Sequence, residues 1–331
     1  MERLPLFDEK FSVKSLRSHI QAIADAISVQ IPRINQPGWM TGLAGMTAFL
    51  YENANWLDEK AKYVDENHKV LQRIIKIIND GFSFPTLAAG LTGILFAFHY
   101  LGERELIDLE DAHSLDEIIP FLEKWGQSQI ENGNLDVLHG GLGPFYVLTS
   151  GSQKWADTWV DLRADTWVGP YGDSQNIDLG LAHGLPSYLL FLSNVKNQTS
   201  NIEKGLTTLL STADFTRKHG SVFPTRIKDG NAQYPSRLAW CYGDAGIGIS
   251  LMLLEERLTG EQFRNGLTGE QFNGLTGILG VGEKVLELAA DRRDPLNTRV
   301  EDPFLCHGSS GLVLIFFKAF LLSKNDKFNA N

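Results

Sequence analysis

The sequence predicts an all-α protein in which inner and outer helices alternate and close into a ring, an α/α toroid. A Gly-x-x-Gly element recurs about every 50 residues, the period of a repeat architecture. An apolar segment follows each element, and amphipathic segments lie between most of them. Helices that are apolar nearly all round are usually buried, whereas amphipathic helices face water. Repeated pairs of this kind can therefore form a ring with the apolar members inside.

The glycine elements mark the expected starts of the inner helices, because glycine before a helix permits a turn or a close backbone approach. Six copies, of which the fourth is degenerate, begin at Gly42, Gly90, Gly140, Gly184, Gly243 and Gly308. We therefore expect about six to seven helix pairs in a single domain that spans residues 1–331.

The segments between the glycines divide into two kinds. The apolar ones, expected to be inner helices, cover residues 46–51, 94–101, 145–148, 188–195, 247–254 and 312–322. The amphipathic ones, expected to be outer helices, cover residues 14–31, 59–79, 115–130, 202–214 and 278–292. In residues 59–79, for example, Val70 and Ile74 recur at helical spacing.

Two stretches interrupt this alternation. Residues 222–234 favour an extended hairpin around Asp229-Gly230, and residues 216–236 are a candidate for a small inserted lobe. Further on, Leu-Thr-Gly-Glu-Gln-Phe occurs twice within residues 258–277. We interpret this repeat as a duplicated loop and assign it no function.

Composition limits the partners. The chain has 331 residues, with 43% hydrophobic and 21% charged residues, as in ordinary globular proteins. A net charge of −10 argues against nucleic acid, which needs a basic face. The acidic N-terminus does not resemble a signal peptide, and the longest apolar stretch, residues 311–322, is too short to span a bilayer. We expect a cytoplasmic protein with no integral membrane segment.

The two cysteines of the chain predict a split metal site. Cys241 and Cys306 each stand two residues before a first glycine, and His307 follows the second cysteine. Two sulfurs and an imidazole suit Zn²⁺ and leave a fourth position for water or substrate, so the set favours one catalytic zinc per chain. Two buried free cysteines, or a disulfide, are the alternative interpretations.

Other polar residues also precede the glycines. If the repeats are structurally equivalent, residues just before each first glycine gather at the same end of the ring. Asp136, His183 and Arg237 belong to this group, as does His139, which we interpret as structural. Tyr242, beside Cys241, is expected to act at the site or to line its pocket.

Four motifs together resemble the lanthionine synthetase C-like (LanC-like) family of peptide cyclases. They are Leu-Asp-Val-Leu-His-Gly (135–140), Leu-Ala-His-Gly (181–184), Ser-Arg-Leu-Ala-Trp-Cys-Tyr-Gly-Asp (236–244) and Cys-His-Gly (306–308). The resemblance implies an α-toroid and a zinc ion held by Cys241, Cys306 and His307. It also implies catalytic roles for Asp136, His183, Arg237 and Tyr242.

The activity that this resemblance implies is an intramolecular Michael addition. A cysteine thiol of a dehydrated ribosomal precursor peptide adds to dehydroalanine or dehydrobutyrine and forms a lanthionine or methyllanthionine ring. On this interpretation His183 carries the proton, Asp136 orients it, and Arg237 faces the enolate. A separate dehydratase is the expected partner.

Two features depart from the family pattern. Pro186 and Ser187 replace the expected ending of the fourth repeat, and six rather than seven glycine elements are visible. Three other functions stay open: addition of glutathione to dehydroamino acids, a non-catalytic peptide-binding scaffold, and a glycosidase. The glycosidase would need two carboxylates, and only Asp136 qualifies clearly.

Overall fold

A computed structural model gives the structure of residues 13–58, 60–150, 176–195, 198–259 and 278–329. It divides into two compact units, which are described separately. Unit 1 comprises residues 1–128 and 138–147, and unit 2 comprises residues 129–137 and 148–331. The expected single domain stays a prediction, because a division into compact units does not test whether each one folds alone.

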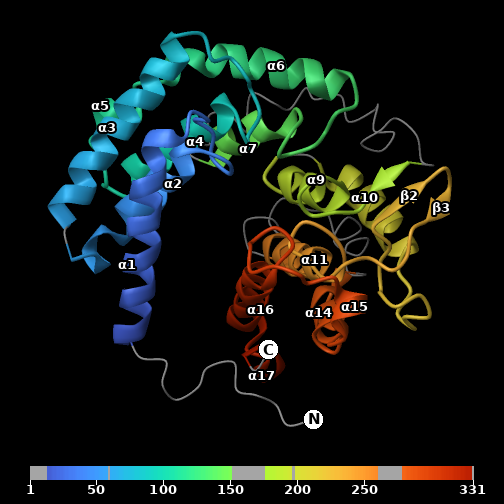
Figure 1. Cartoon of the computed structure of the whole chain (residues 1–331). Helices are drawn as coiled ribbons and strands as arrows, with labels where there is room; N and C mark the ends of the chain where they lie inside the picture. The colour runs from blue at the N-terminus through green and yellow to red at the C-terminus, as the bar shows by residue number, and fades with distance from the viewer. Residues whose placement is uncertain (1–12, 59, 151–175, 196–197, 260–277, 330–331) are drawn as a thin grey trace. The chain divides into compact units, whose positions relative to one another are not determined.

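The described residues are mostly helical, as the sequence predicts. Up to residue 150 the elements are α1 (Val13–Gln30), η1 (Ile31–Arg33), α2 (Leu43–Asn53), η2 (Ala54–Trp56), α3 (Lys60–Asn79), α4 (Leu91–Glu103), α5 (Leu109–Ala112), η3 (Asp116–Ile118), α6 (Ile119–Glu131) and α7 (Leu142–Ser150) (Figure 1). Beyond it they are β1 (Ile177–Asp178), α9 (Leu185–Leu192), α10 (Thr199–Ser211), β2 (Arg226–Lys228), β3 (Asn231–Ala232), α11 (Asp244–Thr259), α14 (Val281–Ala290), α15 (Pro295–Thr298), α16 (Ser309–Ser323) and α17 (Asp326–Asn329). Among the described residues, none of the helices combines the length and apolar character needed to cross a bilayer.

The six apolar segments lie in α2, α4, α7, α9, α11 and α16, and the five amphipathic ones lie in α1, α3, α6, α10 and α14. The predicted alternation of the two kinds is therefore confirmed among the described residues, except between α7 and α9, where residues 151–175 lie outside the part of the chain that the structure describes. In unit 1, Leu50 of α2, Ile74 of α3 and Phe98 of α4 are fully buried. The amphipathic helix α3 packs on the apolar helix α2, and α2 also packs on α4.

The first glycine of each element stands where a loop folds back on the start of the helix. At five of the six positions a side chain would overlap the carbonyl oxygen of the residue six places earlier, and these pairs are Gly42 with Gln36, Gly90 with Phe84, Gly184 with Asp178, Gly243 with Arg237, and Gly308 with Asp302. The same carbonyls of Gln36 and Phe84 accept hydrogen bonds from Leu43 and Leu91, at 2.9 and 2.7 Å. Each carbonyl thus accepts a hydrogen bond from an N–H of the first helical turn, which has no acceptor within its own helix.

Successive loops are joined by backbone hydrogen bonds at one position of the repeat, two residues before the first glycine. In unit 1 the N–H of Met40 donates to the carbonyl of Ala88 at 2.8 Å, and the N–H of Ala88 donates to Leu138 at 3.0 Å. Residues that precede the glycines therefore lie side by side in neighbouring repeats of this unit.

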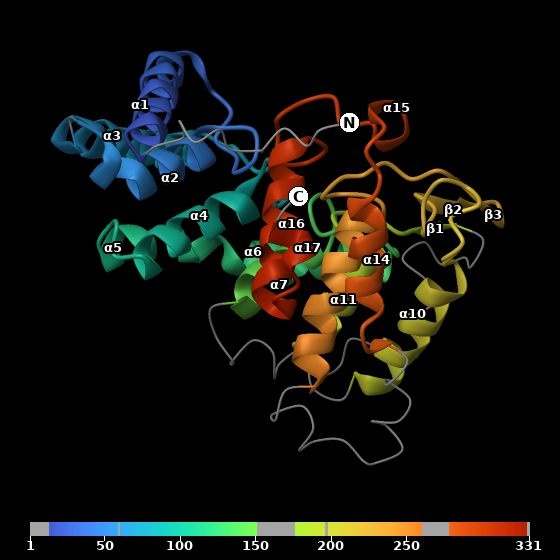
Figure 2. The same cartoon turned by 90° about the horizontal axis from the view of Figure 1, so that it is seen from below.

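The core of unit 2 forms where α11 packs between α14 and α16 (Figure 2). Ile249 of α11, Leu286 of α14 and Ile315 of α16 are among its buried side chains. Within unit 2, this core covers one face of α16. Val313 and Phe317 are half-exposed, since the rest of unit 2 covers only the opposite face of this helix.

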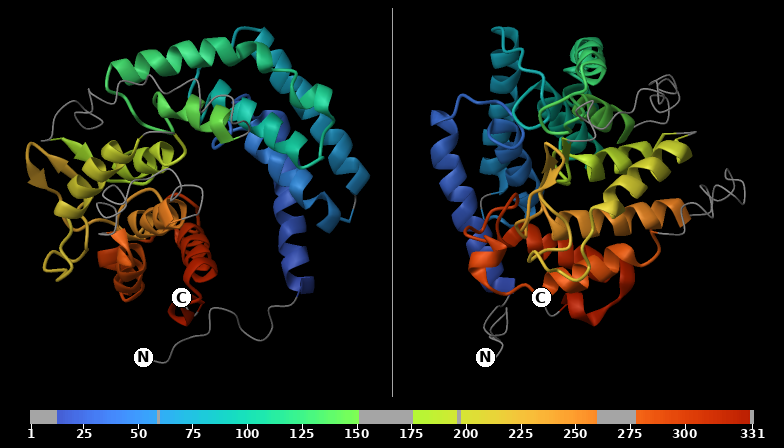
Figure 3. Two further views of the ribbon diagram at one scale, coloured as in Figure 1. Left: turned by 180° about the vertical axis from the view of Figure 1, so that it is seen from behind. Right: turned by 90° about the vertical axis from the view of Figure 1, so that its right-hand side faces the viewer.

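The predicted hairpin is confirmed. Strands β2 and β3 pair antiparallel, and Asp229 and Gly230 form the turn with φ values of 49° and 73° (Figure 3). The sequence did not predict β1, which pairs with β2 and makes a three-stranded sheet. The hairpin occupies part of the proposed lobe of residues 216–236. Most of the duplicated loop, residues 260–277, lies outside the described residues.

A buried ion pair anchors the start of α11. The carboxylate of Asp244 accepts hydrogen bonds from the backbone N–H groups of Val222 and Phe223, at 3.1 and 2.9 Å, and from Arg292 at 3.1 Å. Neither charged side chain is exposed by more than 5%. The ion pair thus ties the segment before the hairpin to α11 and to the residues after α14.

Candidate metal centre

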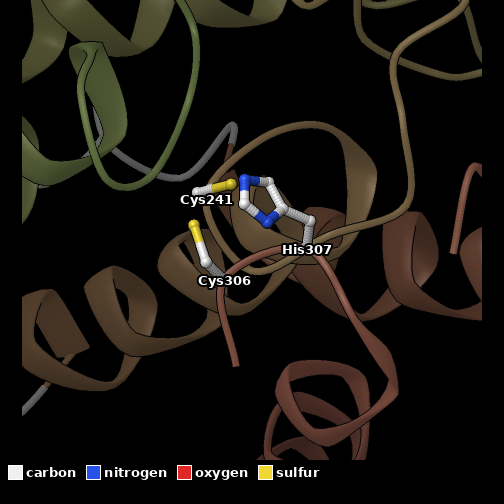
Figure 4. Close-up of side chains that lie close together, drawn as sticks. All are labelled: Cys241, Cys306 and His307. Carbon is white, nitrogen blue, oxygen red and sulfur yellow. The ribbon is translucent and has the colours of Figure 1, made fainter. Parts of the chain in front are cut away.

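Cys241, Cys306 and His307 come together in unit 2 although they are far apart in sequence. One potential ligand atom from each lies within 4.8 Å of the other two, and the three side chains point toward one another (Figure 4). The backbone causes this proximity, because the N–H of Cys241 donates to the carbonyl of Cys306 at 3.2 Å. This bond repeats the one that joins Met40 to Ala88 in unit 1. The three predicted ligands therefore form a group that can hold a metal ion.

The chemistry of the three donors fits a thiolate-binding metal such as zinc. Cys241 is buried, Cys306 is partly buried and His307 is exposed. Burial, and then the hydrogen bond with Cys306, raise the pKa of the Cys241 thiol to about 12. Without a metal this thiol holds its proton at neutral pH, so a metal ion has to displace that proton. Both cysteines are free, so the disulfide alternative does not apply to the structure.

A second group of polar side chains adjoins the cysteine loop. The N–H of Ala182, the residue before His183, donates to the carbonyl of Cys241 at 3.2 Å. Oδ2 of Asp136 accepts a hydrogen bond from Nδ1 of His183 at 2.8 Å, and both side chains are less than 20% exposed. The hydrogen bond to Asp136 raises the pKa of His183 despite its partial burial. Two predicted catalytic residues thus form one partly buried pair.

Tyr242 joins the same group. Its ring stacks on the imidazole of His183 with centroids 5.4 Å apart, and its hydroxyl donates to Oδ2 of Asp178 at 3.2 Å. Burial raises the pKa of Tyr242, which keeps the hydroxyl protonated at neutral pH. The predicted residues Asp136, His183 and Tyr242 therefore lie together.

Asp178 was missed by the sequence analysis. Its carboxylate is buried, with Oδ1 accepting from the N–H of Gly180 at 2.8 Å, and burial raises its pKa. A signal was present, because Asp178 stands six residues before Gly184 just as Arg237 stands six before Gly243. The tyrosine that it holds connects it to the His183 pair.

Arg237 lies on the cysteine side of the site. Its guanidinium donates to the carbonyl of Arg299 at 3.2 Å, and its positive charge acts to lower the pKa of Cys241 against the larger effect of burial. Arg237 therefore adds positive charge beside the thiols.

The departure at Pro186 and Ser187 leaves the helix start unchanged. Helix α9 begins at Leu185 behind Gly184, with the proline in its first turn, where a missing N–H removes no helical hydrogen bond. The hydroxyl of Ser187 donates to the carbonyl of Gly184 at 2.8 Å. His183 therefore precedes its helix as the residues before Gly42 and Gly90 do.

A comparison with protein-family models assigns the chain to a known family. The family described as lanthionine synthetase C-like protein matches residues 34–331. The match covers most of the chain, and the protein belongs to this family.

A search of solved structures gives a match to nisin cyclase. The TM-score is 0.72 at 19% sequence identity, and the alignment covers 96% of this chain and 84% of that one. A likeness at this identity shows a shared fold. A comparison with curated protein sequences gave no significant match.

Proposed function

We propose that the protein is a zinc-dependent cyclase that forms lanthionine or methyllanthionine rings in a dehydrated precursor peptide. The convergence of Cys241, Cys306 and His307 within 4.8 Å carries this proposal. Membership of the family and the fold shared with nisin cyclase support it. We also propose that the helix pairs close into the α/α toroid that the sequence predicts.

The reaction joins two groups of one peptide without a leaving group. The cysteine sulfur bonds to the β-carbon of the dehydroamino acid, and the electron pair of the double bond moves to the α-carbon and its carbonyl oxygen as an enolate. The α-carbon then takes a proton, so the S–H hydrogen is balanced by a new C–H hydrogen. Zinc held by Cys241, Cys306 and His307 would supply the positive charge that keeps the substrate thiol ionised.

The residues beside the cysteines would carry out the proton transfer and stabilise the enolate. His183 delivers the proton to the α-carbon, because its hydrogen bond to Asp136 raises its pKa and holds it in the proton-carrying form. Tyr242, stacked on that imidazole, fixes its plane and stays neutral as a hydrogen-bond donor. Arg237 supplies fixed positive charge for the enolate. A separate dehydratase would prepare the substrate.

The test uses a synthetic peptide that contains one dehydroalanine and one cysteine a few residues apart. Ring formation leaves the mass unchanged and removes the free thiol, so alkylation followed by mass spectrometry counts the uncyclised molecules. We expect the zinc-loaded protein to protect the peptide from alkylation, and His183→Asn to lose this activity while keeping its zinc. The Cys241→Ala/Cys306→Ala variant should lose this activity together with the zinc ion of the cysteine site.

Three other results would contradict the proposal. Persistent alkylation of the peptide with zinc-loaded wild type would favour the scaffold. A product one glutathione heavier, formed only when glutathione is present, would favour the glutathione-adding alternative. Loss of zinc in His183→Asn would show that this histidine acts on the metal site rather than as a proton carrier.

A further inference from the structure

Unit 1 contains a second group of side chains with metal-binding chemistry, remote in sequence from the cysteine motifs. One potential ligand atom from each of His99, His113 and Asp116 lies within 4.8 Å of the other two. The carboxylate stands between the imidazoles, with Oδ1 at 2.7 Å from Nε2 of His99 and Oδ2 at 3.0 Å from Nδ1 of His113. The two rings are 5.1 Å apart. Both histidines therefore face one carboxylate.

The local backbone fixes this geometry. His113 directly follows α5 and Asp116 begins η3, and the N–H of Asp116 donates to the carbonyl of His113 at 3.1 Å. Gly102 allows α4 to approach α5 closely, because a Cβ there would lie 2.5 Å from the Cβ of Ala112. His99 is one turn before Gly102 on α4, so the same approach brings it to the turn.

The charge around the turn favours a cation. Residues 105–123 contain no lysine or arginine but several carboxylates, including Asp111, Asp116 and Glu117. Another histidine of unit 1, His68, pairs with Asp111 at 3.6 Å. The His113 side chain is 57% exposed, which gives an ion a path from solvent. A cation at the turn would therefore meet a negative surface and an open entry.

We infer that His99, His113 and Asp116 form a second divalent metal site, separate from the thiolate site. Two imidazoles and a carboxylate are ligands for borderline ions such as Zn²⁺, Co²⁺ and Ni²⁺. Ligand atoms 2.0–2.2 Å from a tetrahedral zinc lie about 3.4 Å apart, so small side-chain rotations convert the hydrogen-bonded cluster into a coordination shell. A bound ion would fasten α4 to the η3 turn.

The inference is tested by zinc content after the chelator-stripped full chain has been dialysed against zinc and measured by elemental mass spectrometry. We expect two zinc ions per wild-type chain and one in His113→Gln. His68→Gln is the matched control, because it removes an ion-paired histidine of the same unit, and it should keep both ions. The Cys241→Ala/Cys306→Ala variant should keep one ion, and adding His113→Gln should remove it.

Cobalt provides an independent readout on folded protein. Co²⁺ in the wild type should show both sulfur-to-metal charge transfer and the weaker ligand-field bands, and His113→Gln should lose intensity only in the latter. The inference is overturned if zinc uptake is the same in wild type and His113→Gln, whether or not the cysteine site binds an ion of its own. Since neither measurement involves catalysis, failure of the cyclase proposal would not affect this result.

Discussion

Asp178 is a buried carboxylate whose charge is unfavourable where it lies. Its raised pKa means that the folded state disfavours the ionised form, although Tyr242 and the N–H of Gly180 donate to it. A buried carboxylate whose ionised form is unfavourable lowers stability, and residues of this kind are typically retained because they serve function. We propose that it positions Tyr242 over His183.

Asp178→Asn should therefore stabilise the protein while slowing ring formation. We expect the free energy of unfolding at neutral pH to rise, because the amide keeps the shape of the carboxylate without its charge. The gain should vanish in strong acid, where aspartate is protonated in both states, and grow as the pH rises toward the raised pKa. Urea unfolding at several pH values measures it. A loss of stability at neutral pH would show that the charge itself supports the fold.

The Asp136–His183 pair predicts the opposite pH dependence. The pKa of His183 is raised in the folded state, so the pair stabilises the protein fully below the ordinary histidine pKa of about 6.5. This contribution is lost as the pH rises through the raised value. The difference in unfolding free energy between wild type and Asp136→Asn should thus be larger at pH 6 than in alkaline solution. A difference that is independent of pH would exclude a protonated His183 in the pair.

The site residues that could be predicted from the sequence were those of a rare residue type. Cysteine is rare in this chain, and its two occurrences share one repeat position, so their convergence was predictable. Asp178 is one of many acidic residues, and its importance comes from burial and from Tyr242. Its repeat position, six residues before Gly184, can be read from the sequence. Its burial and its hydrogen bond with Tyr242 cannot, because they depend on tertiary packing.

At the scale of elements, the loop before α11 depends on a glycine for two reasons. Gly243 has a φ of 79°, and a side chain there would overlap the carbonyl of Arg237. Gly230 has a similar φ of 73° in the hairpin turn but open space around it. An alanine at Gly230 would therefore introduce backbone strain alone, whereas an alanine at Gly243 would introduce both strain and steric overlap.

Gly243→Ala should cost about 2 to 4 kcal/mol of unfolding free energy, and the matched Gly230→Ala only about 1 kcal/mol. Both are to be measured by urea unfolding with chelator present, so that loss of a metal does not contribute. Equal costs would mean that the loop relaxes away from the added methyl group.

The ion pair of Asp244 and Arg292 should be essential for unit 2. Asp244→Asn leaves the buried guanidinium without its counter-charge, and we expect a loss of about 3 kcal/mol. Asp80→Asn breaks the exposed pair with Lys76 and should cost less than about 0.5 kcal/mol. Comparable losses in the two variants would mean that solvent reaches the Arg292 side chain.

Elements were predictable where their signal is local. Apolar periodicity and the preceding glycines predicted the helices, and Asp229-Gly230 predicted the turn of the hairpin. Strand β1 has two residues and exists because β2 lies beside it, which no local pattern indicates. The half-exposed face of α16 likewise depends on which neighbours are present rather than on its own composition.

At the scale of the whole molecule, metal binding links protonation to stability. Zinc uptake at the cysteine site must release protons, because burial raises the pKa of Cys241 to about 12. We expect the calorimetric heat of zinc binding to change with the ionisation enthalpy of the buffer, and chelation to lower the melting temperature. A heat that is the same in all buffers would mean that the thiols are already ionised.

The distance in sequence between the two halves of the cysteine site has a consequence for synthesis. Cys306 lies in the last repeat and follows Cys241 by a long stretch of chain, yet the backbone hydrogen bond between them belongs to the site. Domains fold progressively while the chain is made, starting from the N-terminus. A nascent chain that has reached Cys241 but not Cys306 holds only one of the two thiols, so this group of ligands cannot assemble until residues 306–308 have been synthesised.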